Sequence, residues 1–238
     1  MRVLHITSWF PNRSDPLECP FVERHIQAMR LTGDHDVWFI AVRRAAKWSW
    51  SRKPLRAQRE YRLHGPVPGW YLIERLTFLF ILWAWITRDR SRRYDLVNFY
   101  CAYPNATLVR SLRRLFGVPV SITEQWTAYH YSFRSTSKGL DRIRRIFHHR
   151  APVVVVSQAL ADDITRFSGA ADIPFQFVDN VVEEGCFTHD TSVPVEAGRF
   201  FAIFGLRGPK RPEVLIDAVQ LLRQRGLPAR LRIAGYGP

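Results

Sequence analysis

The sequence is poor in cysteine, and its cysteines form no motif. Cys19, Cys101 and Cys186 are far apart, and none belongs to a C-x-x-C pair. An odd number of widely spaced cysteines disfavours both a disulfide framework and a zinc site. We therefore expect no metal ion in this protein, and a reducing cytoplasm as its compartment.

Long hydrophobic runs are missing as well. The longest run is Leu76–Ile86, bracketed by Arg75 and Arg88, whereas a transmembrane helix needs about 20 apolar residues. The apolar stretch at the N-terminus is too short for a signal peptide and is typical of a first strand. The sequence thus predicts neither a membrane span nor a secretory leader.

The signatures of several enzyme classes are absent. No G-x-x-x-x-G-K-[ST], G-x-G-x-x-G, G-x-S-x-G or H-E-x-x-H occurs, which disfavours the nucleotide-binding, hydrolase and metalloprotease sites that use these motifs. His148 and His149 are adjacent, so they point to different sides of a helix and are not spaced as a metal-binding pair.

Acidic residues are outnumbered. The 238 residues include 21 Asp+Glu and 35 Lys+Arg, for a net charge of +14. Such a balance favours anionic partners, whether nucleic acid, an anionic membrane face or phosphorylated substrates. Because no nucleic-acid-binding motif occurs, a nucleic-acid-binding protein is a rival that we disfavour, and we expect no nucleic acid as a partner.

What the sequence does contain is an alternation of strand and helix patterns, with 47% hydrophobic residues. This alternation predicts an α/β fold, a Rossmann-like parallel sheet with helices on both faces. We expect an N-terminal domain over 1–178, a linker over 179–199 that contains Gly185, Pro194 and Gly198, and the first β-α-β of a second Rossmann-like domain over 200–238.

Residues 43–62 interrupt this pattern. They hold eight Lys/Arg, one Glu and two Trp without a clean period, which indicates a basic loop. Residues 70–87 then form a helix that is apolar nearly all round, typical of burial on several sides or of contact with lipid. The mixture of tryptophan and cations suits a lipid headgroup layer, so we expect four residues to face a membrane: Trp48, Trp50, Arg52 and Lys53. A buried helix beside a solvated loop is the alternative.

Two loops hold residues suited to binding chemistry. In parallel sheets ligands lie beyond the carboxyl ends of strands, and Glu124, Gln125 and Trp126 follow such an end. Hydrogen-bonding groups beside an indole suit a sugar, although a polar loop with a buried tryptophan would look the same. In the second unit, Arg207 and Lys210 near Gly205 form the natural pair for a diphosphate, or a solvated basic turn.

Taken in order, several segments resemble glycosyltransferase family 4, whose members are retaining enzymes of the GT-B fold. The segments are Pro20–His25, Ile122–Trp126 (the family's Thr-Glu-His-Trp), Val155–Leu160 (Val-Ser-Glu-Ala-Leu), Asp179–Val182 with Phe187, Lys210–Ala218 and Ile233–Pro238 (Gly-Asp-Gly-Pro).

The resemblance implies transfer of a sugar from a nucleotide sugar, with retention, to a glycan or lipid-linked acceptor in cell-surface polysaccharide synthesis. It implies that Arg207, Lys210 and Gly205 bind the donor diphosphate without a metal or other cofactor, and that Glu124, Gln125 and Trp126 are catalytic. The acceptor-side loop is Pro20, Phe21 and His25. An anionic membrane surface, at the inner face of the cell membrane, is a further expected partner.

The sequence departs from the family pattern in three places. Gln125 stands where the family has His, no glycine precedes Gly33, and the chain stops before the family's Glu-x7-Glu motif. We expect the chain to be an incomplete form of a longer enzyme that does not turn over alone. A non-catalytic membrane- or partner-binding remnant of such an enzyme is the alternative.

Overall fold

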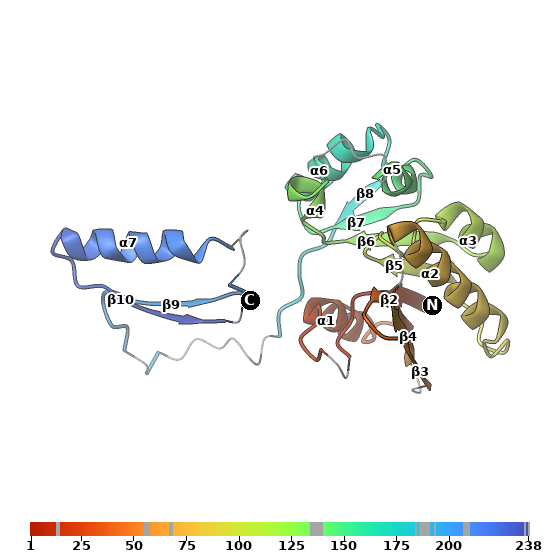
Figure 1. Ribbon diagram of the computed structural model, residues 1–238, viewed down its shortest axis with the longest axis horizontal. Helices are drawn as coiled ribbons and strands as arrows, with labels where there is room; N and C mark the ends of the chain where they lie inside the picture. Colours follow the sequence, from red (N-terminus) through yellow and green to blue (C-terminus); the bar gives the residue numbers. More distant parts are fainter. Residues whose placement is uncertain are drawn as a thin grey trace. The chain divides into compact units, whose positions relative to one another are not determined.

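The computed structural model describes residues 1–12, 15–54, 58–66, 69–133, 140–183, 185, 191–192, 194–206, 210–235 and 237, without the side chains of 52–54, 58 and 69–71. It divides into two compact units, Met1–Glu183 and Glu184–Pro238 (Figure 1).

The first unit is built on a sheet that has eight strands within the described residues, in the order β3-β4-β2-β1-β5-β6-β7-β8. Every neighbouring pair is parallel except β3 and β4. The strands are β1 (Arg2–Thr7), β2 (Asp34–Arg44), β3 (Ser49–Pro54), β4 (Gln58–Gly65), β5 (Leu96–Tyr100), β6 (Val120–Glu124), β7 (Val153–Val155) and β8 (Phe175–Phe177). The predicted parallel α/β sheet is confirmed.

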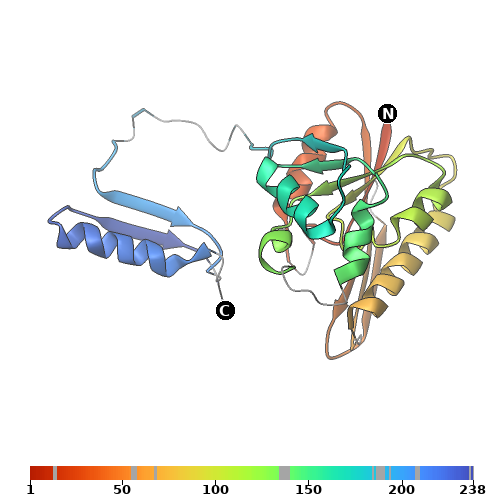
Figure 2. The same ribbon diagram turned by 90° about the horizontal axis from the view of Figure 1, so that it is seen from above.

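Helices cover both faces of this sheet (Figure 2). On one face, α1 (Pro20–Met29) buries Val22 and Ile26 against β2 and Tyr100. On the other face lies the larger core, where Leu4 and Ile6 point because side chains alternate along β1. The helices with buried residues in this core are α2 (Gly69–Ile86), α3 (Val109–Phe116), α4 (Ala128–Tyr131), α5 (Asp141–Phe147) and α6 (Gln158–Ser168).

The basic loop predicted for 43–62 is wrong, because most of this segment is a β-hairpin. β3 pairs antiparallel with β4, and β4 pairs parallel with β2. The hairpin is stable despite its charge because Glu60 and Tyr61 are buried, and the Arg62 guanidinium lies 2.5 Å from the Glu60 carboxylate. On β3, the Trp50 ring stacks on Phe80 of α2, with centroids 5.0 Å apart. The sequence offers no clean period of two here, because Glu60 and Tyr61 are buried side by side and the residues around them are charged.

The second unit is a β-α-β motif. β9 (Arg199–Ile203) pairs parallel with β10 (Arg230–Ala234), and α7 (Pro212–Gln224) connects them. Two glycines lie where a side chain would collide with backbone: a Cβ on Gly235 would be 2.0 Å from the Phe204 carbonyl oxygen, and one on Gly237 would be 2.6 Å from that of Leu206. The assignment of this unit to donor binding stays a prediction.

Among the helices of the described residues, none combines the length and the hydrophobicity that crossing a membrane requires.

Candidate functional site

The carboxyl ends of three central strands lie in register at one edge of the first sheet. Thr7 of β1 pairs with Tyr100 of β5, and Tyr100 pairs with Thr123 of β6. The loops that follow these strands therefore meet at this edge, which is where parallel sheets bind ligands.

Glu124 joins two of these loops from inside the protein. Its side chain is fully buried. One carboxylate oxygen, Oε1, accepts hydrogen bonds from the backbone N–H groups of Gln125 and Trp126, both at 2.9 Å. The other, Oε2, accepts from the Ala102 N–H and the Tyr129 hydroxyl, both at 2.8 Å. The carboxylate thus fixes the backbone after β5 and after β6 at once.

Burial and hydrogen bonding have opposite effects on the pKa of Glu124. Burial raises the pKa of the carboxyl group, and the four donated hydrogen bonds oppose that rise because they stabilise the charged form. With both oxygens engaged and no exposed surface, Glu124 does not reach a ligand. The geometry gives it a positioning role, in which it sets the direction of Gln125 and Trp126.

His25 and Gln125 come together from residues 100 positions apart. His25 is buried on α1, and its Nε2 accepts a 3.1 Å hydrogen bond from the Val181 backbone N–H. The neutral ring therefore carries its proton on Nδ1, which lies 3.4 Å from the Gln125 side-chain amide. Because an N–H needs an acceptor, we assign the amide oxygen of Gln125 to face it. Burial lowers the pKa of His25, and a hydrogen bond with Asn180 opposes the shift.

Trp126 forms part of an aromatic wall beside this pair. The centroid of its ring lies 6.0 Å from that of Trp9, 6.3 Å from that of Tyr103 and 5.2 Å from that of Phe133. Trp9 and Trp126 are half-buried, so each keeps part of its ring accessible. The guanidinium of Arg43 lies 4.7 Å from the Trp9 ring centroid and donates to the Ser8 carbonyl at 2.9 Å. Half-buried indoles beside amide and imidazole groups can stack on a sugar ring and bind its hydroxyls.

The start of α1 borders the same edge. Cys19 has a left-handed φ of 47°, and Pro20 occupies the first turn of the helix. This is the segment where the sequence lacks the glycines of the family pattern, so Cys19 adopts a conformation that glycine takes without strain. Pro20 and Phe21 are half-buried, and the third predicted acceptor-side residue, His25, contacts the side chain of Gln125.

Two of the three predicted diphosphate-binding residues of the second unit lie within the described residues. Gly205 follows β9, Lys210 is exposed just before α7, and Arg207 lies outside the described residues. Arg211 then takes a left-handed φ of 47° and is followed by Pro212 in the first turn of α7.

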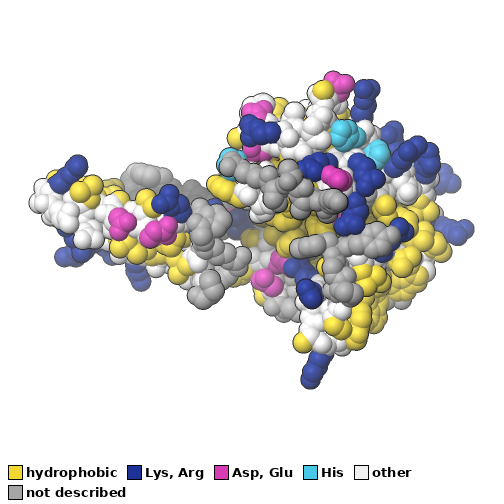
Figure 3. Space-filling view, turned by 45° about the horizontal axis from the view of Figure 1, so that its top comes forward, with side chains coloured by type: hydrophobic (Ala, Val, Ile, Leu, Met, Phe, Trp, Pro, Cys, Tyr) yellow, Lys and Arg dark blue, Asp and Glu magenta, His cyan; other side chains and the backbone are white. Residues whose placement is uncertain are grey.

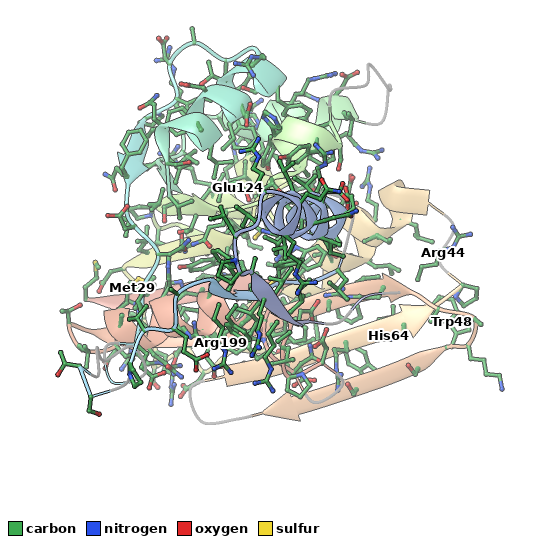
Figure 4. The ribbon with its side chains drawn as sticks, turned by 90° about the vertical axis from the view of Figure 1, so that its left-hand side faces the viewer. Met29, Arg44, Trp48, His64, Glu124 and Arg199 are labelled. Atoms are coloured by element: carbon green, nitrogen blue, oxygen red, sulfur yellow. The ribbon has the colours of Figure 1, made fainter. Side chains whose placement is uncertain are left out.

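The expected membrane-facing tryptophans are exposed: Trp48 by 60% and Trp50 by 47%. Arg52 and Lys53 belong to β3, but their side chains lie outside the described residues. Arg44, Trp48 and His64 lie near one another where β2, β3 and β4 meet (Figure 4). Over the stretches that the structure describes, no group of three or more His, Cys, Asp or Glu could hold a metal ion.

Sequence reasoning missed several members of this site. Trp9 lies just after β1, and Arg43 lies at the end of β2. Because both follow the carboxyl end of a predicted strand, the same rule that selected Glu124 could have selected them. Tyr103 and Tyr129 contact the predicted loop from neighbouring segments, and nothing in their local sequence marks them.

A comparison with protein families identifies the family of this chain. Residues 20–180 match the family model of the glycosyl transferase 4-like domain, which is more than half of the chain. The chain belongs to this family. No curated protein matches it.

Solved structures show the same fold at low sequence identity. One, described as trehalose-6-phosphate from E. coli bound with UDP-2-fluoro glucose, is 9% identical with a TM-score of 0.58, over 100% of this chain and 65% of that chain. Arabidopsis thaliana UGT89C1 complexed with quercetin is 12% identical with a TM-score of 0.52, over 92% of this chain and 62% of that chain. The same protein complexed with UDP-L-rhamnose is 12% identical with a TM-score of 0.55, over 100% of this chain and 68% of that chain. The chain thus spans about two thirds of the length of these proteins. The likeness confirms the Rossmann-like GT-B fold class.

Proposed function

We propose that this chain carries the acceptor side of a retaining glycosyltransferase, which transfers a sugar from a nucleotide sugar to a glycan or lipid-linked acceptor. The observation that carries the proposal is the cluster at the carboxyl edge of the sheet. There the buried Glu124 holds Gln125 and Trp126 beside His25. The family match and the nucleotide sugars named with two of the similar structures support it.

Each residue of the cluster has a role that its environment allows. Trp126 and Trp9 stack on a sugar ring, and the Gln125 amide binds one of its hydroxyls. Gln125 carries no proton at neutral pH, and the lowered pKa of His25 keeps that ring neutral. The cluster therefore orients an acceptor by hydrogen bonding, and Glu124 acts as a positioning residue.

The donor is assigned to the second unit. There Lys210 and Arg207 would neutralise the diphosphate leaving group, which stabilises the charge that develops as the glycosidic bond breaks. Gly205 would let the backbone approach the diphosphate closely. A cation pair of this kind performs the task without a metal ion. UDP-sugars bound to two of the similar structures support a nucleotide sugar as the donor.

The setting we propose is cell-surface polysaccharide synthesis at the inner, cytoplasmic face of the cell membrane, with a lipid-linked acceptor. The positive charge of the chain supports it, because lipid diphosphates and anionic headgroups are both negative.

A thermal-shift titration tests the donor assignment. We expect a nucleotide sugar of the UDP class to raise the melting temperature of the purified chain. We expect Lys210→Gln to weaken donor binding about tenfold, which is the loss of one charge-assisted contact. Arg225→Gln, which removes an exposed charge at the other end of α7, is the matched control and should bind as the original does. If no nucleotide sugar of a broad panel shifts the melting temperature, the chain is a non-catalytic remnant instead.

The acceptor side needs a separate measurement. Titration of lipid-linked or free oligosaccharides, followed by calorimetry, should show binding that Trp126→Ala weakens about tenfold and Trp126→Phe weakens less, because stacking needs a flat ring. Equal binding by Trp126→Ala would remove this residue from the site. Sugar transfer by the chain alone would contradict our expectation that it does not turn over by itself.

A further inference from the structure

The longest helix in the described part of the first unit, α2, is apolar on both sides but packs on only one. Its inner side contacts the core through Ile81, Ala84 and Trp85, all buried. A helix at the surface of a water-soluble fold normally presents polar residues on its outer side. Apart from Arg75, the outer side of α2 does not, so its composition needs a cause other than the core.

The outer side carries a stripe of aliphatic residues with a spacing of seven. Leu72, Leu79 and Ile86 are exposed by 36%, 55% and 55%. Residues seven apart lie on the same side of a helix, so the stripe follows α2, which is about 27 Å long at 1.5 Å per residue. The half-buried Leu76 lies on the same side, and Arg75 is exposed beside it.

The β3–β4 hairpin extends this surface. The Trp50 ring stacks on Phe80 of α2, and its centroid lies 6.3 Å from that of Trp83, yet Trp50 as a whole remains 47% exposed. Trp48, 60% exposed, lies over Gly65 at the end of β4, where a Cβ would be 2.2 Å from the indole. We call Leu72, Leu79, Ile86, Trp48 and Trp50 the α2 surface. Hydrophobic side chains gather over this part of the molecule in Figure 3.

The chain segments that carry the α2 surface are strongly basic. Residues 43–93 contain thirteen Lys/Arg and three Asp/Glu. Of the three acids, Glu60 and Glu74 are buried and paired with Arg62 and Arg142. Asp89 is exposed and lies 3.9 Å from Arg92. In this stretch the exposed cations, among them Arg44, Lys47, Arg75, Arg90 and Arg93, therefore far outnumber the exposed acids.

We propose that the α2 surface binds the surface of a lipid bilayer with anionic headgroups, and that α2 lies flat on it. The aliphatic stripe and the indoles enter the headgroup and upper acyl region, and the surrounding cations contact the headgroups. A second copy of the chain fits less well, because the two basic rims would repel each other. The inference concerns the surface of the first unit and does not depend on the transfer reaction.

Vesicle flotation of the purified chain, without donor or acceptor, tests the proposal. We expect binding to phosphatidylcholine vesicles that contain about 30% phosphatidylglycerol to exceed binding to pure phosphatidylcholine at least tenfold, and to fall at 0.5 M salt. Leu79→Ser with Ile86→Ser should reduce binding roughly tenfold. The matched control is Leu31→Ser with Val195→Ser, which changes two exposed aliphatic residues elsewhere and should bind within twofold of the original.

Quenching gives a second readout that is independent of affinity. Lipids brominated in the upper acyl chain should quench tryptophan fluorescence of the bound chain, and Trp48→Phe with Trp50→Phe should remove most of this quenching. Circular dichroism should show that all variants fold.

Three outcomes would overturn the proposal. The first is equal binding to neutral and anionic vesicles, or none. The second is a dimer in sedimentation velocity that Leu79→Ser with Ile86→Ser dissociates, because the α2 surface would then bind a second copy. The third is salt-sensitive binding to duplex DNA or RNA that exceeds vesicle binding and is unchanged by the two serine substitutions, because the cations alone would then be responsible.

Discussion

The two units of this chain begin their first helices in the same way but differ in what lies beneath them. In each, a residue with a φ of 47° precedes a proline in the first helical turn: Cys19 before α1 and Arg211 before α7. Beneath α1 there is a packed core and the buried polar cluster around Glu124. Beneath α7 the described residues bury only Val219 and Ala229 among the hydrophobic ones. Equal local geometry therefore does not imply equal stability, because stability depends on buried area.

Hydrogen exchange tests this difference in stability between the two units, and it is the largest effect that we predict. The amides of α7 should open with a free energy of about 1 kcal/mol or less, whereas those of β1 and β5 should open with about 5 kcal/mol or more. Phe201 and Ile203 on β9 are exposed by 64% and 74%, so little apolar burial holds the second unit. Equal protection of α7 and β5 in native-state exchange would contradict the comparison.

The second prediction concerns the buried carboxylate that distinguishes the first unit. Glu124→Ala leaves three backbone N–H groups and the Tyr129 hydroxyl without their acceptor, and should lower the free energy of unfolding by about 3 kcal/mol or more. Glu124→Gln should lower it less, because its oxygen still accepts on one side while its NH2 faces the Ala102 N–H on the other.

Tryptophan fluorescence measures this change selectively, because all eight tryptophans lie in residues 9–126. Glu183→Ala removes an exposed carboxylate of the same unit and should change the unfolding free energy by no more than about 0.5 kcal/mol. A similar, small effect of Glu124→Ala would show that its hydrogen bonds do not hold the two loops.

The third prediction concerns the stability of the first unit in acid, which depends on His5. Burial, followed by the positive charges of His35 and Arg30, lowers the pKa of His5 to about 3. The unfolded chain, with the ordinary pKa of about 6.5, takes up this proton first as pH falls. The contribution of His5 to the free energy of unfolding is therefore complete above pH 6.5 and is lost as pH falls toward 3, with a loss of about 2 to 3 kcal/mol at pH 4.5.

The comparison with His5→Gln isolates this effect from other titrating groups. The difference in unfolding free energy between the two proteins, followed by tryptophan fluorescence from pH 7 to pH 4.5, should shrink or reverse as pH falls. A constant difference would mean that His5 takes up its proton in the folded state as easily as in the unfolded one.

The sequence was sufficient for features that depend on local pattern. The alternation of apolar runs with helical patterns predicted the parallel α/β sheet. Serine is also a typical helix N-cap, and the Ser157 hydroxyl oxygen accepts from the Leu160 N–H at the start of α6. The loop of Glu124, Gln125 and Trp126 was found because it follows a strand. These features depend on neighbours in the chain, which periodicity reports directly.

What the sequence did not show depends on contacts between distant residues. The family resemblance predicted a catalytic Glu124, whereas its burial and its four hydrogen bonds show that the carboxylate faces inward. The β3–β4 hairpin was missed because its arginines hide the buried Glu60 and Tyr61. The contact of His25 with Val181 joins residues 156 positions apart, and no local pattern encodes it.

The smallest effect we predict returns to the two helix starts. Left-handed backbone costs a non-glycine residue about 1 kcal/mol, so at both positions glycine should be more stable than alanine by about that amount. At position 19 glycine should be nearly neutral against the natural residue, because the side chain that packs against the core beneath α1 is lost. Cys19→Gly should therefore match the original in tryptophan-monitored unfolding, and Cys19→Ala should fall about 1 kcal/mol below it.

At position 211 the side chain is exposed, and its contact is with Glu213 at 3.3 Å, also exposed, a kind of pair that contributes little. Arg211→Gly should then slow hydrogen exchange in α7 slightly, and Arg211→Ala should not. If glycine and alanine behave alike at both positions, the left-handed turn is not strained, and the proline that follows it is enough to start each helix. If they differ at position 19 alone, the first turn of α7 opens too readily for its backbone conformation to affect stability.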